Sequence, residues 1–141
     1  MPLSDSAQFS FAVDAGARLA IARMAGVLTG PDMEHIIAAV HHDPAWRPGF
    51  DAVWDCSAVE AHAVLPADLE PILDAAVEDG GGRDVLVEGP GLAADLFSKL
   101  LALRIRRRGG DAVVVESLRE ALAALGHAAP PPALASFVAG D

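Results

Sequence analysis

The stretch MAGVLTGPDMEHIIAAV, residues 24–40, contains the change from strand to helix that decides the fold. Glycine and threonine interrupt an extended run here, and Thr29 or Gly30 can cap a following helix. Pro31 suits the first turn of that helix, because its missing N–H has no intrahelical partner there. Four apolar residues then recur at i, i+3, i+4 and i+7: Met33, Ile36, Ile37 and Val40. We therefore expect a strand to lead into a helix over 31–43.

Upstream, apolar and polar residues alternate over residues 9–14, which is the period of a half-buried strand. Ala15-Gly16 supplies a turn, and residues 19–25 form a second apolar run, so the opening segment is predicted to be a β-hairpin. Downstream of the helix, residues 50–54 predict a third strand that ends at Asp55-Cys56-Ser57.

The rest of the chain alternates between helices and strands. A second helix is predicted over 68–79, with the apolar stripe Leu69, Ile72, Leu73, Ala76 and Val77. A short strand at 85–87 precedes a long helix, whose predicted apolar stripe is Leu92, Leu96, Leu100 and Leu103, widened by Phe97 and Leu101. Residues 112–115 predict a fifth strand, and Ser117 caps a last helix that runs through Leu125.

The resulting order, ββαβαβαβα, predicts an α/β protein with a single mixed five-stranded sheet and about four helices. We expect one α/β domain over residues 9–126, an N-terminal extension over 1–8 and a proline-rich C-terminal tail over 127–141. The tail is predicted to be irregular, although three of its apolar residues can dock on the domain: Leu134, Phe137 and Val138.

Composition limits the function classes that the chain can belong to. The 141 residues are 52% hydrophobic, which suits one globular domain. No run reaches the ~18 uncharged apolar residues of a membrane span, and residues 1–8 lack the features of a secretory signal. The single cysteine excludes an internal disulfide, so we expect a cytoplasmic protein. The net charge of −10 argues against nucleic acid as a partner.

Two segments and the order of elements carry a resemblance to a known family. The first is MAGVLTGPDMEHI, residues 24–36. The second is HDPAWRPGFDAVWDCSAV, residues 42–59, with its Asp43-Pro44 pair and a strand that ends in aspartate. Over about residues 9–126 the chain resembles the STAS domain of bacterial anti-sigma-factor antagonists, and in particular it is similar to SpoIIAA-like small bacterial proteins. The resemblance implies a STAS-like fold and a regulatory role through protein binding.

STAS antagonists typically carry a phosphorylated serine or threonine, within an Asp-Ser-Ser/Thr-Gly motif, at the start of the helix after the third strand. This chain has Leu-Pro-Ala-Asp at 65–68 near that place, with no hydroxyl group. Ser57 lies at the predicted strand end, well before the helix. The resemblance therefore does not extend to the phosphorylation site.

Polar residues at the predicted end of the third strand form the first candidate site: Asp55, Cys56, Ser57 and His62. Three interpretations are open. The residues can simply mark where a buried strand meets solvent, or they can form the rim of a binding pocket, since ligands of open α/β sheets bind beyond strand ends. They can also catalyse a reaction in which Cys56 or Ser57 is the nucleophile and His62 the base. No nucleophile-elbow glycines flank them, so we predict no catalytic residue.

A basic cluster near the end of the long helix is the second candidate site: Arg104, Arg106, Arg107 and Arg108. These side chains can interact favourably with the helix dipole, or they can contact an acidic protein, a second copy of the chain or an anionic headgroup. His35, His41 and His42 lack metal-ligand spacing, and the turn at 88–91 lacks a complete phosphate-binding motif. We therefore predict no metal site and no cofactor.

These observations lead to three functional hypotheses, in order of preference. The first is a non-enzymatic STAS-like regulatory module that binds a protein partner or forms a homodimer. The second is a carrier or sensor of a small apolar or lipid-like ligand, held between the helices predicted at 31–43 and 68–79. The third is a hydrolase-like enzyme that uses Cys56 or Ser57.

Overall fold

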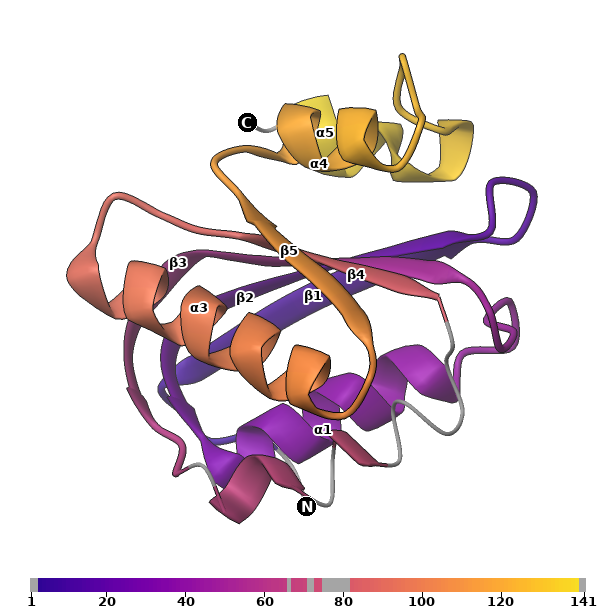
Figure 1. Ribbon diagram of the computed structural model, residues 1–141. Coiled ribbons are helices and arrows are strands. Elements are labelled where there is room, and N and C mark those ends of the chain that lie inside the picture. The colour runs from indigo at the N-terminus through magenta and orange to yellow at the C-terminus, as the bar shows by residue number, and fades with distance from the viewer. Residues whose placement is uncertain (1–2, 66, 71–72, 75–81, 140–141) are drawn as a thin grey trace.

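A mixed sheet of five strands forms the centre of the molecule, which confirms the α/β prediction (Figure 1). The computed structural model describes residues 3–65, 67–70, 73–74 and 82–139. The strands lie side by side in chain order: β1 (Ala7–Asp14), β2 (Leu19–Thr29), β3 (Asp51–Ala63), β4 (Arg83–Val87) and β5 (Asp111–Val115). β1 is antiparallel to β2, and the other neighbouring strands are parallel. The predicted hairpin therefore lies at one edge of the sheet.

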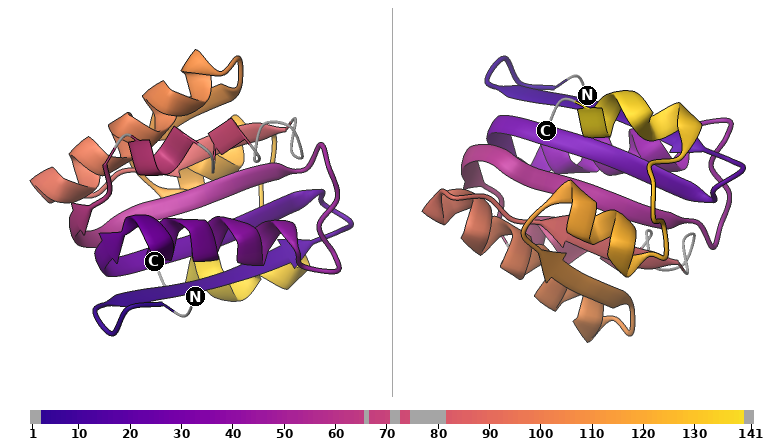
Figure 2. Two further views of the ribbon diagram at one scale, coloured as in Figure 1. Left: turned by 90° about the horizontal axis from the view of Figure 1, so that it is seen from below. Right: turned by 90° about the horizontal axis from the view of Figure 1, so that it is seen from above.

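Helices cover both faces of the sheet (Figure 2). One face carries α1 (Gly30–His41), α3 (Leu92–Arg107) and the helical residues 67–70 and 73–74. These segments share a face, as expected when parallel crossovers follow one hand and each leads to the next strand in the same direction across the sheet. The opposite face carries α4 (Leu118–Ala124), the 3₁₀ turn η1 (Pro132–Leu134) and α5 (Ala135–Ala139). Among the described residues, η1 and α5 are helical segments that the sequence does not predict.

The strand-to-helix change at residues 24–40 occurs largely as predicted. Thr29 is the N-cap of α1, and its side chain accepts a hydrogen bond from the Asp32 backbone N–H while the Asp32 carboxylate accepts one from the Thr29 N–H. Asp32 also accepts two hydrogen bonds from Ser4, which ties the N-terminal segment to the helix. The predicted apolar stripe of α1 is buried along its whole length.

The sheet divides the core into two parts because successive side chains of a strand point to opposite faces. In β3, Ala52, Trp54 and Cys56 belong to the larger core beneath α1 and α3. Val53 belongs to the smaller core beneath α4 and η1. In β4, Leu86 faces α1 and α3, whereas Val85 and Val87 face the other side.

Two strands are longer than predicted. β2 continues past Ala25 to Thr29, because Gly26 lies in an irregularity of the β2–β3 ladder and adopts a φ of +82°, which bends the strand without ending it. β3 continues past Asp55 to Ala63, since β2 pairs with it that far, whereas the pairing of β3 with β4 stops at Asp55. The prediction that the third strand ends at Asp55 is therefore wrong, and the polar trio lies in mid-strand.

The buried face of α3 also differs from the predicted leucine stripe. The residues that are buried are Ala94, Phe97, Ser98, Leu101, Ala102 and Ile105. Leu92, Leu96 and Leu103 are instead 74%, 53% and 45% exposed. The small side chains on the buried face allow the helix to lie close to the sheet, and this close packing outweighs the burial of three leucines.

The C-terminal tail is more ordered than predicted. Leu134 of η1 is fully buried in the smaller core, and Phe137 packs against that core, while the side chain of Val138 lies outside the described part. Of the second predicted helix, residues 68–70 and 73–74 are helical, and Leu69 and Leu73 are buried. Ile72, Ala76, Val77 and the glycines at 80 and 81 lie outside the described residues. None of the helices described has the length and apolar character to span a membrane.

Candidate functional site

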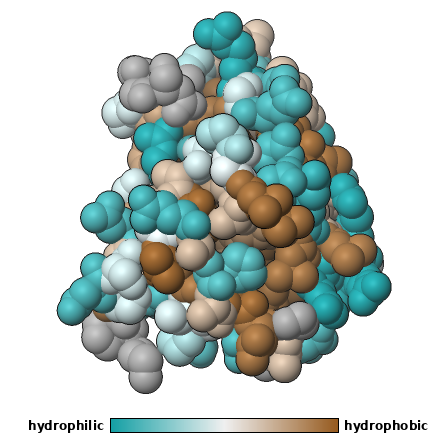
Figure 3. All heavy atoms as spheres, turned by 90° about the vertical axis from the view of Figure 1, so that its left-hand side faces the viewer, coloured by the Kyte–Doolittle hydropathy of each residue, from teal (hydrophilic) through white to brown (hydrophobic). Residues whose placement is uncertain are grey.

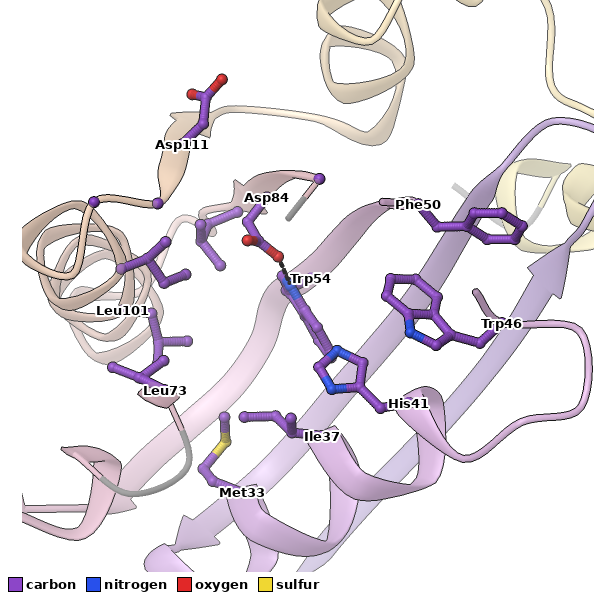
Figure 4. A pocket seen from close by; sticks show the side chains of 15 residues that line it. Met33, Ile37, His41, Trp46, Phe50, Trp54, Leu73, Asp84, Leu101 and Asp111 are labelled. Carbon is purple, nitrogen blue, oxygen red and sulfur yellow. Dashed lines mark hydrogen bonds between the residues drawn. The ribbon is translucent and has the colours of Figure 1, made fainter. Parts of the chain in front are cut away.

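A cavity of about 200 Å³ lies between α1 and α3, at the end of the sheet where β3, β4 and β5 begin (Figure 4). Its walls are mostly apolar and aromatic. The apolar side chains are Met33, Ile37, Leu73, Leu86, Leu101 and Ile105, and the rings are His41, Trp46, Phe50 and Trp54. Two carboxylates, Asp84 and Asp111, and three glycines, Gly82, Gly109 and Gly110, complete the described lining.

Helical and strand periodicity bring these side chains together. Met33, Ile37 and His41 are spaced four residues apart, so they follow one side of α1. Leu101 and Ile105 have the same spacing on α3. The sheet supplies Trp54 from β3 and Asp84 and Leu86 from β4, at positions that point to the face covered by α1 and α3.

The aromatic wall is built largely by the loop between α1 and β3. The His41 and Trp46 rings stack with centroids 5.0 Å apart, and Trp46 meets Phe50 edge to face at 5.5 Å. Arg18 lies in the turn between β1 and β2, and its guanidinium carbon lies over the Phe50 ring, 5.6 Å from the ring centroid. Trp46, Phe50 and Trp54 are all buried, so the wall is packed against protein and does not project into solvent.

Asp84 supplies the polar group of the cavity. The Trp54 Nε1–H donates a hydrogen bond of 2.9 Å to Asp84 Oδ1, and the two side chains meet in the middle of the close-up (Figure 4). Burial raises the pKa of the Asp84 carboxyl to about 6; the Trp54 hydrogen bond opposes this shift, and the nearby Asp51 and Asp111 carboxylates add to it. The Asp111 carboxylate points away from that of Asp84. Asp84 is thus a desolvated carboxylate in an apolar, ring-lined site.

A cavity with these properties can hold a small organic molecule. An engineered apolar cavity of about 150 Å³ takes up benzene, so this space suits a body the size of one aromatic ring. Ligand sites in proteins usually combine apolar walls with a few placed polar groups, as here.

The predicted rim residues lie elsewhere. The Asp55 carboxylate points to the face covered by α5, where Oδ2 accepts a 3.1 Å hydrogen bond from Arg23 Nε. Its Oδ1 accepts hydrogen bonds from the Ser57 backbone N–H and hydroxyl, at 2.9 and 2.6 Å. The Arg23 guanidinium also donates to the Phe137 carbonyl oxygen and lies over the Phe137 ring. Through Arg23, Asp55 therefore helps to hold the C-terminal segment against the sheet.

Cys56 and His62 do not form a nucleophile–base pair in the described structure. Cys56 is fully buried on the α1–α3 face, and burial, followed by the negative charge of Asp55, raises the pKa of its thiol far above the usual range. Such a thiol is a poor nucleophile. The His62 ring packs on Phe97 with centroids 4.9 Å apart, and its buried Nδ1 has no hydrogen-bond partner in the described part of the chain.

The basic cluster makes contacts within the chain. Arg104 pairs with Glu70 at 3.3 Å, and Arg108 pairs with both Glu70 and Asp74, which lie in the helical residues 67–70 and 73–74. Arg106 donates to the Ala112 carbonyl oxygen at 2.7 Å, and Arg107 is exposed. Arg104 and Arg108 therefore link α3 to Glu70 and Asp74 through ion pairs. Contact with a partner or an anion stays a prediction, as does the rim formed by Asp55, Cys56, Ser57 and His62.

Sequence reasoning placed a ligand between helices but did not find the residues of this cavity. Trp46 and Trp54 gave the available signal, because they are the only two tryptophans of the chain and both line the cavity. A second signal of the site was Asp84, because a carboxylate directly before the apolar run 85–87 is placed at the start of a buried strand. Over the described residues, no group of three His, Cys, Asp or Glu side chains is placed to hold a metal ion.

Comparison with known proteins adds no functional assignment. No family model matches the chain, and no curated protein matches it either.

Proposed function

We propose that this protein is a non-enzymatic binding module that holds a small, mainly apolar molecule in the cavity between α1 and α3. The observation that carries the proposal is the cavity itself: about 200 Å³ of space with ring and aliphatic walls and one half-buried carboxylate. The space is partly open to solvent, and apolar walls with one placed polar group are typical of pockets that bind small molecules. The proposal develops the second hypothesis drawn from the sequence.

Intrinsic fluorescence gives a site-selective test, because both tryptophans line the cavity and the chain has no tyrosine. We expect at least one of three ring-sized probes, benzyl alcohol, benzylamine or benzoate, to change the tryptophan emission saturably. Ile37→Phe enlarges a lining side chain and is expected to weaken binding by about tenfold or more, since it fills the space that the probe needs.

Val113→Phe is the matched control, because it makes a similar enlargement at a half-exposed site on β5 outside the cavity lining. This variant should bind as the unaltered protein does. The absence of a saturable change with all three probes would refute the proposed function, and so would equal loss of binding in both phenylalanine variants.

A second candidate function, partner binding of the kind implied by the STAS resemblance, is supported by the exposed leucines of α3. Leu92, Leu96 and Leu103 lie on one side of the helix, outside the core. Figure 3 shows hydrophobic side chains gathered into a patch on the side of the molecule where α3 begins. Asp95 near the start and Arg107 at the end of α3 would lie opposite each other in an antiparallel pair of these helices, so we propose a second copy of the chain as the partner.

Light scattering on a size-exclusion column tests this second function. We expect a concentration-dependent dimer that the double substitution Leu96→Lys with Leu103→Lys converts to a monomer, because two charges would be buried without partners. Val113→Lys adds a charge elsewhere on the surface and should leave the dimer intact. A strict monomer at all concentrations tested would contradict the proposal.

A further inference from the structure

Among the described residues, the Asp84 carboxylate has no positively charged partner. Its single hydrogen-bond donor is the Trp54 Nε1–H, and across residues 3–65, 67–70, 73–74 and 82–139 it forms no ion pair. A carboxylate has about four lone-pair sites for hydrogen bonds, so this group retains capacity for further donors. Asp84 is half-buried, and charges that are withdrawn from water are usually paired, so the missing ion pair is informative.

The basic groups nearest in sequence are engaged elsewhere. Arg83, the neighbour of Asp84, pairs with Asp51 at 3.2 Å and also donates to carbonyl oxygens at the end of α4, on the opposite face of the sheet. Arg108, close to the Gly109-Gly110 turn, pairs with Glu70 and Asp74. The cavity lining itself holds two carboxylates and neither lysine nor arginine among its described residues.

The aromatic rings of the cavity lining also favour a positive charge. Tryptophan and phenylalanine present negative faces, over which a cation is attracted electrostatically, and tryptophan does so most strongly. Trp46, Phe50 and Trp54 all contribute to the lining, and the Trp54 ring is anchored directly to the carboxylate. The Arg18 guanidinium over Phe50 shows that one of these rings already holds a cation within the chain.

From these contacts we infer that the ligand of the cavity is a small organic cation, an ammonium group on an aromatic or aliphatic body, with Asp84 as its counter-ion. This inference rests on the proposed binding function and specifies its ligand class. The ammonium N–H groups donate to Asp84, the Trp54 ring lies beside the charge, and the apolar body fills the space lined by Ile37 and Leu101. An anionic ligand of the same size would be repelled by the Asp84 carboxylate.

Three probes that share a ring and differ in charge test the inference. Benzylamine is cationic at neutral pH, benzyl alcohol is neutral and benzoate is anionic. At a pH above 7, we expect benzylamine to bind about tenfold more tightly than benzyl alcohol, a difference of about 1.4 kcal/mol, and benzoate to bind most weakly. Tryptophan fluorescence and calorimetric titration report the three affinities.

Asp84→Asn should remove the preference for benzylamine while retaining binding of benzyl alcohol, because the amide oxygen can still accept the Trp54 hydrogen bond. Glu60→Gln is the matched control, since it removes one negative charge at an exposed position of β3 and should leave the preference unchanged. If Asp84→Asn does not fold, the relative affinities of the unaltered protein for the three probes still test the cation inference.

The possible failures are distinguishable. Equal affinities for benzylamine and benzyl alcohol, or equal effects of the two variants, would overturn the cation inference and leave the binding function standing. The same holds if benzoate binds most tightly. Absence of binding by all three probes would overturn both.

Discussion

Arg23→Met is expected to destabilise the protein by about 3–5 kcal/mol, because it leaves the buried Asp55 carboxylate without its cation. Asp55 is only 2% exposed and Arg23 30% exposed, so solvent screens this pair weakly. The substitution also removes the hydrogen bond to the Phe137 carbonyl oxygen and the contact over the Phe137 ring. We therefore expect faster hydrogen exchange in α5 together with the loss in the free energy of unfolding, measured by urea denaturation.

Two controls separate charge burial from simple loss of a side chain. Arg83→Met removes the arginine of the more exposed Arg83–Asp51 pair, in which Arg83 is 48% exposed, and should cost less than about 1 kcal/mol. The double substitution Arg23→Met with Asp55→Leu should recover part of the stability, since it no longer buries an unpaired charge. If Arg23→Met lowers the free energy of unfolding by no more than Arg83→Met does, the Arg23–Asp55 ion pair is not a main source of stability and the prediction fails.

Asp84→Asn is expected to stabilise the ligand-free protein at neutral pH. The pKa of the Asp84 carboxyl rises from 3.8 to about 6 on folding, mainly because the group is buried. Since one pKa unit corresponds to about 1.4 kcal/mol, the ionised group costs on the order of 3 kcal/mol above pH 6. The neutral asparagine avoids this cost.

The sign of the pH dependence follows from proton binding. Between about pH 4 and pH 6 the folded state keeps a proton on Asp84 that the unfolded state has lost, so stability falls as pH rises through this window. The advantage of Asp84→Asn should therefore be small at about pH 4, grow up to about pH 6 and stay constant above it. Thermal or urea unfolding across this range measures it, with Glu60→Gln as the charge-matched reference. A pH-independent difference would contradict the environment assigned to Asp84.

This expected cost is relevant to function. A residue that lowers the stability of its own fold, without a compensating ion pair among the described residues, is the kind of exception found at binding sites. An ammonium ligand would supply the missing counter-ion, and it would stabilise the folded state in proportion to its occupancy.

Several features were determined by the sequence alone, because they depend on short-range rules. The cap at Thr29, the proline in the first turn and the buried stripe of α1 follow from residues within a few positions of one another. The alternation at residues 9–14 and the apolar runs of the later strands likewise predicted the mixed five-stranded sheet.

Only the tertiary structure decided the remaining features, because each depends on which surfaces meet. On α3, periodicity predicted one leucine stripe widened by Phe97 and Leu101. The sheet instead packs against the side with Ala94, Ser98 and Ala102, whose small side chains allow a close approach. The length of β3 depended on pairing with β2, which local pattern does not reveal. The cavity draws its lining from α1, the loop after it, three strands and α3, so its carboxylate, rings and aliphatic walls become neighbours only when the chain folds.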